Sequence, residues 1–368
     1  MSEETVKDKT LGMLVAHVTG DALGAPYEFI KEWKERIASF DGTIKTEPSY
    51  TTRYNKVIKG VVGQWTDDTE MTITLLDVLI QNKMVYDPIL AIQGYLAWAN
   101  SKPMGMGKNT RSLFYGVTTV KGYDKRFQKF SKETTPPESN GCLMRCSPFA
   151  LLSEDTWEAA LVEDVNLTNP CPNAREACIA YVKCLRLCFS FCNEKDRILR
   201  PKDIVERVCV QTTGLTYVVL QHVIYTGLYE KQQLDSFIGD KILRHTGHFT
   251  VHDYTNVQSR HKGWIFCSLY IALYCFVHKN NYQEAMEYII RQGGDTDTNA
   301  AICGALFGAY YGFTKLVKDP VTLRNWFIVE HVNTDVEDAR PRPARYHPSR
   351  YFAMSYEATF LNFHPCAE

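Results

Sequence analysis

The chain has 368 residues, of which 45% are apolar and 23% charged, and its formal net charge at pH 7 is −1. This balance is typical of a soluble globular protein with a large core, and it gives no general field for nucleic acid or an anionic membrane. The polar first ten residues predict no secretory leader, and the longest apolar stretch, 263–277, is shorter than the ~20 residues of a membrane span. We therefore expect a cytoplasmic protein.

Helical periodicity dominates the sequence, and the only strand candidate is 56–62. In chain order, the predicted helices cover 6–23, 68–82, 88–99, 147–153, 174–193, 203–211, 214–229, 263–278, 282–292 and 298–312. Many helices with short links are typical of an all-α fold. Residues 121–140 are interpreted as a surface loop, and 340–352 as an extended tail rich in Pro and Arg. We predict one domain over 1–368, with 340–368 a C-terminal surface segment.

The chain has 12 cysteines and no CxxC pair. Cys184, Cys188 and Cys192 are spaced four apart and fall on one helical face. No histidine or second cysteine pair completes a zinc set, so the sequence favours free thiols that pack as small apolar groups in a reducing compartment.

Two acids, Asp21 and Glu28, lie at and just beyond the end of the first predicted helix, in the segment GDALGAPYEF at 20–29. Gly24 and Pro26 end that helix. Asp21 lies within an apolar stretch and is expected to be buried and hydrogen-bonded or structural. Glu28 lies on the turn beyond it, where an acid can reach into a site, although an exposed loop position explains this motif equally well.

Acids and threonines gather at the start of the helix predicted after Trp65, in the segment Thr66-Asp67-Asp68-Thr69-Glu70. Threonine caps helices, and acids in the first turn suit the helix dipole. Helix capping is therefore a sufficient explanation of this motif alone.

A second cluster, GGDTDTN at 293–299, precedes the small-residue helix near the C-terminal end. Asp295 and Asp297 exceed what a cap requires, and the two preceding glycines leave space beside the carboxylates. Together the two motifs offer four aspartates, which would balance two Mg²⁺ ions, with Mn²⁺ as an alternative. The pair of motifs therefore favours a two-metal site over two helix caps.

These segments, together with SNGCLMRCSP at 139–148, resemble the ADP-ribosylglycohydrolase family in sequence and in order. That family includes hydrolases that remove ADP-ribose from arginine or serine, and the bacterial enzyme that reactivates dinitrogenase reductase. The resemblance covers residues 20–312. It implies a compact orthogonal bundle of helices and Mg²⁺-dependent cleavage of the glycosidic bond between ADP-ribose and a protein side chain or small conjugate.

The resemblance also implies roles for individual residues. Metal ligands are expected at Thr66, Asp67, Asp68, Asp295, Asp297 and Thr298. Catalytic roles are expected for Glu28, as a mobile acid, and for Asp67 or Asp68, which would orient a water molecule. Contacts with ADP-ribose are expected at Gly107, Asn140, Gly141, Met144, Arg145 and Asn169. From the residues alone, Asn140-Gly141 is only a turn, and Arg145 is a lone cation able to meet a phosphate.

Two departures from the family bear on the substrate. Asn169 stands where the family commonly has a histidine, and an asparagine donates a hydrogen bond without carrying charge. Gly105 stands where arginine-directed members often carry an acid, the natural partner of a guanidinium. This departure weakens the hypothesis that the substrate is ADP-ribosylated arginine. The expected partners are ADP-ribosylated proteins or ADP-ribose conjugates, with no nucleic acid or membrane, and we expect a monomer.

Three other functions remain possible at this stage. The same ligands would serve a two-metal phosphoester hydrolase, and the same fold would serve a non-catalytic ADP-ribose-binding or structural protein. His245, His248 and His252 suggest a zinc enzyme, but the Thr, Gly and Asp between them favour a polar loop near the site.

Overall fold

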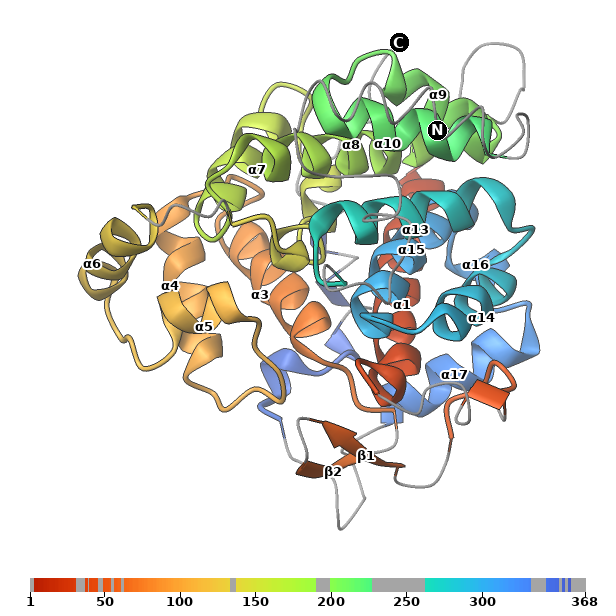
Figure 1. Ribbon diagram of the computed structural model, residues 1–368, viewed down its shortest axis with the longest axis horizontal. Coiled ribbons are helices and arrows are strands. Elements are labelled where there is room, and N and C mark those ends of the chain that lie inside the picture. Colours follow the sequence, from red (N-terminus) through yellow and green to blue (C-terminus); the bar gives the residue numbers. More distant parts are fainter. Residues whose placement is uncertain are drawn as a thin grey trace.

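A computed structural model of the chain describes residues 3–30, 37–38, 40–45, 49–53, 56–60, 63–132, 137–189, 199–226, 262–331, 342–350, 353–354 and 357–358. The described part is built almost entirely of helices (Figure 1), so the predicted all-α fold is confirmed. The longer helices are α1 (Glu3–Gly24), α3 (Asp67–Gln81), α4 (Pro88–Ala99), α6 (Val120–Phe130), α7 (Trp157–Asn166), α8 (Pro172–Phe189), α9 (Pro201–Cys209), α10 (Gly214–Tyr225), α13 (Ile265–His278), α14 (Tyr282–Gln292), α15 (Thr296–Tyr311) and α17 (Pro320–His331).

Shorter elements connect these helices. They are α5 (Lys108–Phe114), α16 (Phe313–Leu316) and the 3₁₀ turns η1 (Ala25–Tyr27), η2 (Asn140–Cys142), η3 (Ser147–Leu151) and η4 (Ala344–Tyr346). Strands β1 (Ser49–Arg53) and β2 (Lys56–Gly60) form an antiparallel hairpin in which Ser49 pairs with Gly60. The hairpin contains the predicted strand as β2, whereas β1 was not predicted.

Helices α1 and α15 form a close antiparallel contact at the centre of the molecule. Helices α8, α13 and α14 pack against α15 around this contact (Figure 1). Small residues recur every four positions along both helices, so their backbones touch. An added Cβ at Gly12 would lie 2.6 Å from the Gly308 carbonyl oxygen, and one at Gly24 would lie 2.6 Å from the Asp297 Cα. The contact therefore sets the end of α1 directly against the first turn of α15.

Replacing Gly304 by alanine tests this contact. The new methyl group would overlap the carbonyl oxygen of Ala16, and two packed backbones cannot yield as a side chain would. We expect a loss of about 1–3 kcal/mol in the free energy of unfolding, measured by urea denaturation. Gly94→Ala, inside α4, is the control, because its methyl group meets only the Thr74 and Val78 methyl groups. Equal stability of the two variants would show that the contact is looser than described.

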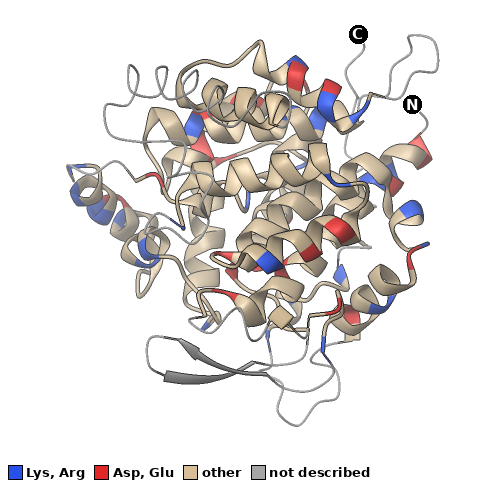
Figure 2. Cartoon of the chain, turned by 45° about the vertical axis from the view of Figure 1, so that its right-hand side comes forward, with Lys and Arg blue, Asp and Glu red and all other residues tan. Residues whose placement is uncertain are grey.

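Helices α5, α6, α7, α16 and α17 were not predicted, and α6 replaces the first half of the loop expected at 121–140. Thr119 caps α6 by accepting a hydrogen bond from the Gly122 N–H. Tyr123 stacks on Phe114 and Phe127, with ring centroids 5.3 and 5.7 Å apart, and this aromatic face docks an otherwise polar helix. The outer face of α6 is basic, with Lys121, Lys125 and Lys129 exposed, and carries several blue segments in Figure 2.

The cysteine prediction holds where the structure describes it. Cys184 and Cys188 are free, buried thiols in the core, and burial raises the pKa of Cys188 to about 12. Cys192 and the loop with His245, His248 and His252 lie outside the described residues. Every helix in the described part of the chain is too short or too polar to cross a lipid bilayer.

Several residues of the tail expected on the surface are buried, among them Arg342, Tyr346 and Pro348. Arg342 is buried, with 8% of its surface exposed, and η4 follows it where an extended chain was expected.

Candidate active site

Asp21 organises the start of α3 from a neighbouring helix. Its two carboxylate oxygens accept hydrogen bonds from the main-chain N–H groups of Thr66 and Thr69, at 3.0–3.1 Å, and from both threonine hydroxyls. Thr66 is the N-cap residue of α3 but makes no side-chain cap of its own. The capping that the sequence suggested for Thr66 is thus supplied by Asp21, which fixes the α3 terminus against α1.

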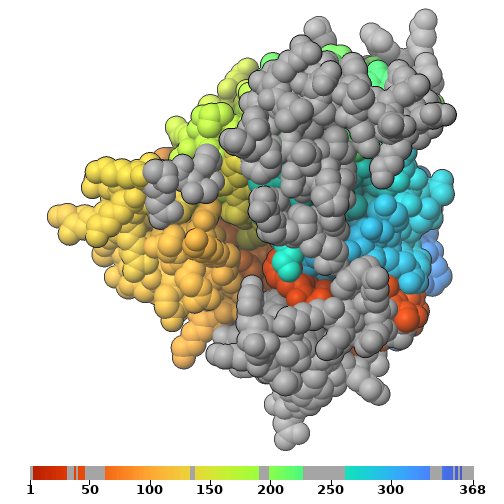
Figure 3. All heavy atoms as spheres, viewed as in Figure 1, coloured from red at the N-terminus to blue at the C-terminus, as the bar shows by residue number. Residues whose placement is uncertain are grey.

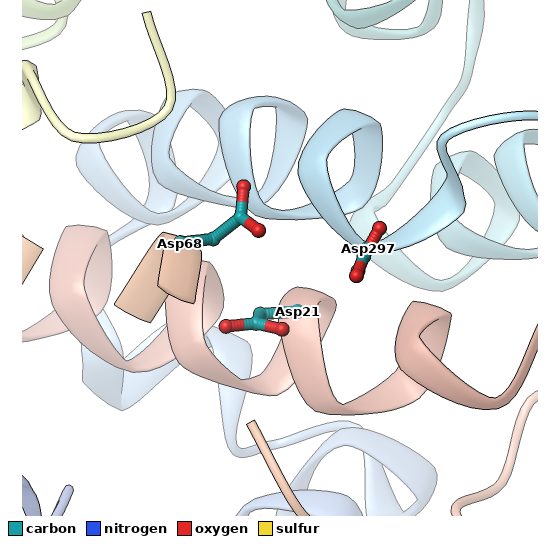
Figure 4. A group of neighbouring side chains, drawn as sticks. All are labelled: Asp21, Asp68 and Asp297. Carbon is teal, nitrogen blue, oxygen red and sulfur yellow. The ribbon is translucent and has the colours of Figure 1, made fainter. Parts of the chain in front are cut away.

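Three carboxylates meet at this junction. Asp21, Asp68 and Asp297 each offer an oxygen, and these oxygens all lie within 4.8 Å of one another. Figure 4 shows the three side chains facing a common space between α1, the start of α3 and α15. The Oδ2 atom of Asp68 lies 2.9 Å from the Thr66 hydroxyl, whereas its buried Oδ1 atom has no hydrogen-bond partner among the described residues. An orphaned buried carboxylate oxygen in such a cluster is suited to a cation.

A second group shares Asp297 with the first. Glu28, Asp295 and Asp297 also bring one oxygen each within 4.8 Å of the others. Gly293 and Gly294 turn the chain with φ values of 70° and 80°, and the Gly294 carbonyl accepts a hydrogen bond of 2.9 Å from the Phe29 N–H. This bond joins the turn after α1 to the second motif and places Glu28 beside Asp295 and Asp297.

Neighbours hold the second group in place. The Asn140 side-chain amide donates to Asp295 Oδ2 at 2.8 Å and to the Ser268 hydroxyl at 2.9 Å. The Thr298 N–H donates to Asp297 Oδ1 at 3.0 Å, and Thr298 is 5% exposed. Asn140 and Thr298 therefore lie at the cluster, each touching one of its aspartates.

The clustered acids perturb one another strongly. Burial, followed by the charge of Asp297, raises the pKa of Asp21 to about 7 and that of Asp67 to about 6. The same two causes hold the pKa of Asp68 and of Asp295 well above the ordinary value. The two groups contain five carboxylates, and the all-oxygen donor set fits a hard divalent cation. Such ions would replace the protons that these carboxyls otherwise retain.

This perturbation predicts how ions and pH act on stability. A carboxyl whose folded pKa is raised stabilises the fold below its unfolded value near 3.8, and this stability is lost as pH rises through the folded value of about 6–7. We expect the melting temperature in chelator to fall between pH 5 and 8, and Mg²⁺ to raise it more at pH 8 than at pH 5.5. Calorimetry at both pH values checks this, and an equal Mg²⁺ effect would contradict it.

Asp67 points to a different neighbour, the loop before α5. Its Oδ2 atom accepts a hydrogen bond of 3.2 Å from the Gly107 N–H. A Cβ at position 105 would lie 2.5 Å from the Asp67 Oδ1 atom. A side chain at position 105 would require the Asp67 carboxylate to move, and an acid there would also be repelled by that carboxylate.

Two of the residues predicted to contact substrate are engaged elsewhere. Arg145 is fully buried, and its guanidinium donates to Asp164 at 2.9 Å and to the Gly141 carbonyl at 2.8 Å. Asn169 is fully buried as well, and its amide donates to the Pro137 carbonyl at 2.6 Å and to the Ser139 carbonyl at 3.0 Å. Both predictions of direct contact are corrected: these side chains hydrogen-bond to backbone carbonyls of the 137–145 segment and hold it in place.

The remaining predicted contacts are distributed around the cluster. Gly107 is exposed beside Asp67, Gly141 is half-buried, and Met144 is 5% exposed with its carbonyl 3.4 Å from the Thr72 hydroxyl. In Figure 3 the red N-terminal part of the chain reaches the surface between the orange α4–α5 region and the blue region of α14–α15. The sequence did not reveal that Asp21 both accepts the hydrogen bonds of the α3 terminus and belongs to the first carboxylate group. Its position in an apolar helix next to Gly20 was the available signal.

Sequence comparison identifies relatives of this chain. A protein of Acanthamoeba polyphaga mimivirus, whose name assigns it to the ADP-ribosyl glycohydrolases, is 25% identical over 84% of this chain and 88% of its own. "ADP-ribosylarginine hydrolase Tri1" of Pseudomonas putida is 21% identical over 89% of this chain and 76% of its own. "ADP-ribosyl-[dinitrogen reductase] glycohydrolase" of Rhodospirillum rubrum is 22% identical over 85% of this chain and 88% of its own.

The fold has a counterpart among solved structures. The chain of an "ADP-ribosylglycohydrolase-related protein complex" superposes with a TM-score of 0.60 at 20% identity, over 97% of this chain and 98% of that one. The sequence model described as ADP-ribosylglycohydrolase matches residues 2–334, a span that contains every residue of the carboxylate cluster. The chain therefore belongs to the ADP-ribosylglycohydrolase family.

Proposed function

We propose that this protein hydrolyses the glycosidic bond between ADP-ribose and a protein side chain or a small conjugate, using two divalent cations, with Mg²⁺ favoured. One observation carries the proposal: carboxylates from three separate segments form two groups that share Asp297. Family membership supplies the substrate class, and the cluster supplies the chemical means. Bound divalent cations would hold ribose hydroxyls and lower the pKa of a water molecule.

The residues around the cluster divide the work. Both oxygens of Asp21 already accept hydrogen bonds, so Asp21 positions the α3 terminus and adds negative charge. Asp68 and Asp297 have the central position, and Asn140 orients Asp295. Glu28 is half-buried on a turn, which suits a group that transfers a proton to or from the reacting sugar. Positive charge develops on the sugar as the bond breaks, and this cluster of acids stabilises it.

The acceptor attached to ADP-ribose is a finer part of the proposal. Two of the relatives are named as ADP-ribosylarginine hydrolases, but at 21% and 20% identity. In this chain, Asp67 fills the space in which an acid at position 105 would stand. We therefore infer that arginine is not a privileged leaving group here, and that serine-linked or small conjugates are equally accepted.

A panel assay tests the proposal. Peptides carrying ADP-ribose on arginine, serine or glutamate, and a simple phosphate ester, are incubated with the protein in Mg²⁺ or in chelator. We expect release of free ADP-ribose from at least one peptide, in Mg²⁺ only. Release of phosphate alone would indicate a phosphoester hydrolase. A thermal shift with ADP-ribose but no release from any peptide would indicate a binding protein, and either result would overturn the proposal.

A further inference from the structure

Arg342 forms a buried ion pair with the motif at the start of α3. Its guanidinium donates to both carboxylate oxygens of Glu70, at 2.6 and 2.7 Å, and each side chain is 2% exposed. Glu70 stands three residues after Asp67, in the same helical turn. Arg342 lies beyond residues 2–334, the span that matches the family model. The ion pair therefore joins the start of α3, which carries part of the carboxylate cluster, to a segment outside the family match.

The remaining donors of Arg342 hold the loop before α5. They reach the carbonyls of Ser101 and Lys102, at 2.7 and 3.1 Å, and the Ser101 hydroxyl at 2.9 Å. The Trp98 indole N–H donates to Glu70 at 2.8 Å and closes the network on the α4 side. One side chain thus bridges the first turn of α3 and the loop before α5.

Both bridged elements hold Asp67. The first turn of α3 carries its backbone, and the loop that begins at Ser101 ends at Gly107, whose N–H binds the carboxylate. Gly105 of the same loop packs on the other oxygen of Asp67. Arg342 therefore fixes the distance between the two supports of this acid. A shift of the loop would move the Gly107 N–H and leave Asp67 without its orienting bond.

A second contact ties the same segment to α3. We name residues 342–350 the C-terminal strap. Arg350 makes two bonds of 2.8 and 2.9 Å to Asp77, seven residues along α3 from Glu70, and this pair is partly exposed. His347 packs edge-on against Trp65, with ring centroids 5.4 Å apart. The strap thus follows α3 from its first turn outward. Arg342 binds Glu70 and the loop at once, and Tyr346 adds a hydrogen bond to Ser101.

We propose that Arg342 is a positioning residue for the active site, acting through Glu70 and the 101–107 loop on Asp67. The proposal rests on the proposed function for its catalytic consequence. It assigns to the C-terminal strap, outside the family match, a part in forming the site. Removing Arg342 is expected to lower kcat and to weaken the response to divalent ions, with little change in KM for the ADP-ribosyl substrate.

The test compares Arg342→Gln with Arg350→Gln, which removes the other strap-to-α3 ion pair without touching the loop. The measurements are kcat, KM, the Mg²⁺ concentration for half-maximal rate, and the Mg²⁺-induced shift in melting temperature. For Arg342→Gln we expect kcat to fall about 10–100-fold and the half-maximal Mg²⁺ concentration to rise several-fold. Arg350→Gln is expected to keep both within about twofold of the parent. Arg342→Lys, which keeps the charge but not the fork of donors, is expected to recover only part of kcat.

A double variant guards against simple misfolding, because Arg342→Gln leaves Glu70 buried without its partner. Combining Glu70→Gln with Arg342→Gln removes both charges and retains an acceptor for Trp98. This variant is expected to fold and still to show the loss of kcat and of Mg²⁺ response. Parent-like values in the folded double variant would overturn the proposal. If the parent chain releases no ADP-ribose, the proposed function fails, and the strap is then judged by the Mg²⁺-induced melting shift alone: an unchanged shift in the double variant overturns it.

Discussion

Replacing Asp297 by asparagine is expected to abolish turnover while making the ion-free protein more stable. Asp297 belongs to both carboxylate groups, so a neutral amide removes negative charge from each at once. Loss of one shared ligand should reduce kcat more than about 100-fold and remove most of the Mg²⁺-induced melting shift. Burial is the main cause of the raised pKa of Asp68 and Asp295, and the charge of Asp297 is the second. The change to asparagine removes that second cause, so the melting temperature in chelator should rise.

The opposite signs of these two effects make the result specific. A variant damaged in its fold would lose both activity and stability. Asp77→Asn is the matched control, since Asp77 lies on α3 but pairs with Arg350 away from the cluster. It should retain activity and the Mg²⁺ response. Full turnover of Asp297→Asn in Mg²⁺ would refute the assignment of a shared ligand. The Asp67→Asn variant, whose carboxylate lies outside both groups, should lose less activity.

Replacing Arg145 by methionine should cause a large loss of stability. The Arg145–Asp164 ion pair is fully buried on both sides, and Asp164 also accepts a hydrogen bond of 2.9 Å from the Tyr95 hydroxyl. Removing one partner leaves a buried carboxylate without its counter-charge, which costs about 3–5 kcal/mol. Urea denaturation measures this loss. Lys183→Met, which breaks a partly exposed pair of 3.8 Å with Glu158, should change stability by less than about 1 kcal/mol.

The Arg145 experiment also separates two interpretations of that residue. If the guanidinium met a phosphate, as the sequence suggested, Arg145→Met would weaken binding of ADP-ribose and leave the fold stable. The structure predicts the reverse order of effects, because the guanidinium is fully buried and donates to protein acceptors. A stable variant that has lost ADP-ribose binding would restore the first interpretation. Adding Asp164→Leu to Arg145→Met should recover part of the lost stability.

The parts of the fold that the sequence predicted are those in which a single helix carries its own pattern. The bounds of α4 and α14 match their predictions, since both have clear apolar periodicity and an Asp or Asn cap. Helix α6 was missed because its docking face is aromatic and its outer face highly charged, and the partner ring of Phe114 lies on another helix. Short helices depend on such tertiary contacts more than on local preference.

The candidate site likewise contains residues that the sequence reveals and residues that it does not. Acids at the start of α3 and α15 stand out in the sequence because a cap requires fewer of them. The roles of Asp21 and Arg342 do not, because their partners lie 45–48 and 272 residues away in the chain. Arg145 and Asn169 show the same limit: a lone polar side chain does not reveal whether its acceptor is a ligand or the protein's own backbone.

The backbone contact between α1 and α15 has a consequence for how the site can adapt. Helices that pack through interdigitating side chains can slide when those side chains change rotamer. The glycine-lined seam between α1 and α15 has no side chains that could adjust in this way. A slip by one turn would displace Asp21 from Asp297 by about 5.4 Å. The backbone contact between the two helices thus fixes the distance between Asp21 and Asp297. Any accommodation of different sugars or leaving groups must therefore come from outside this seam, for example from the turn that bears Glu28.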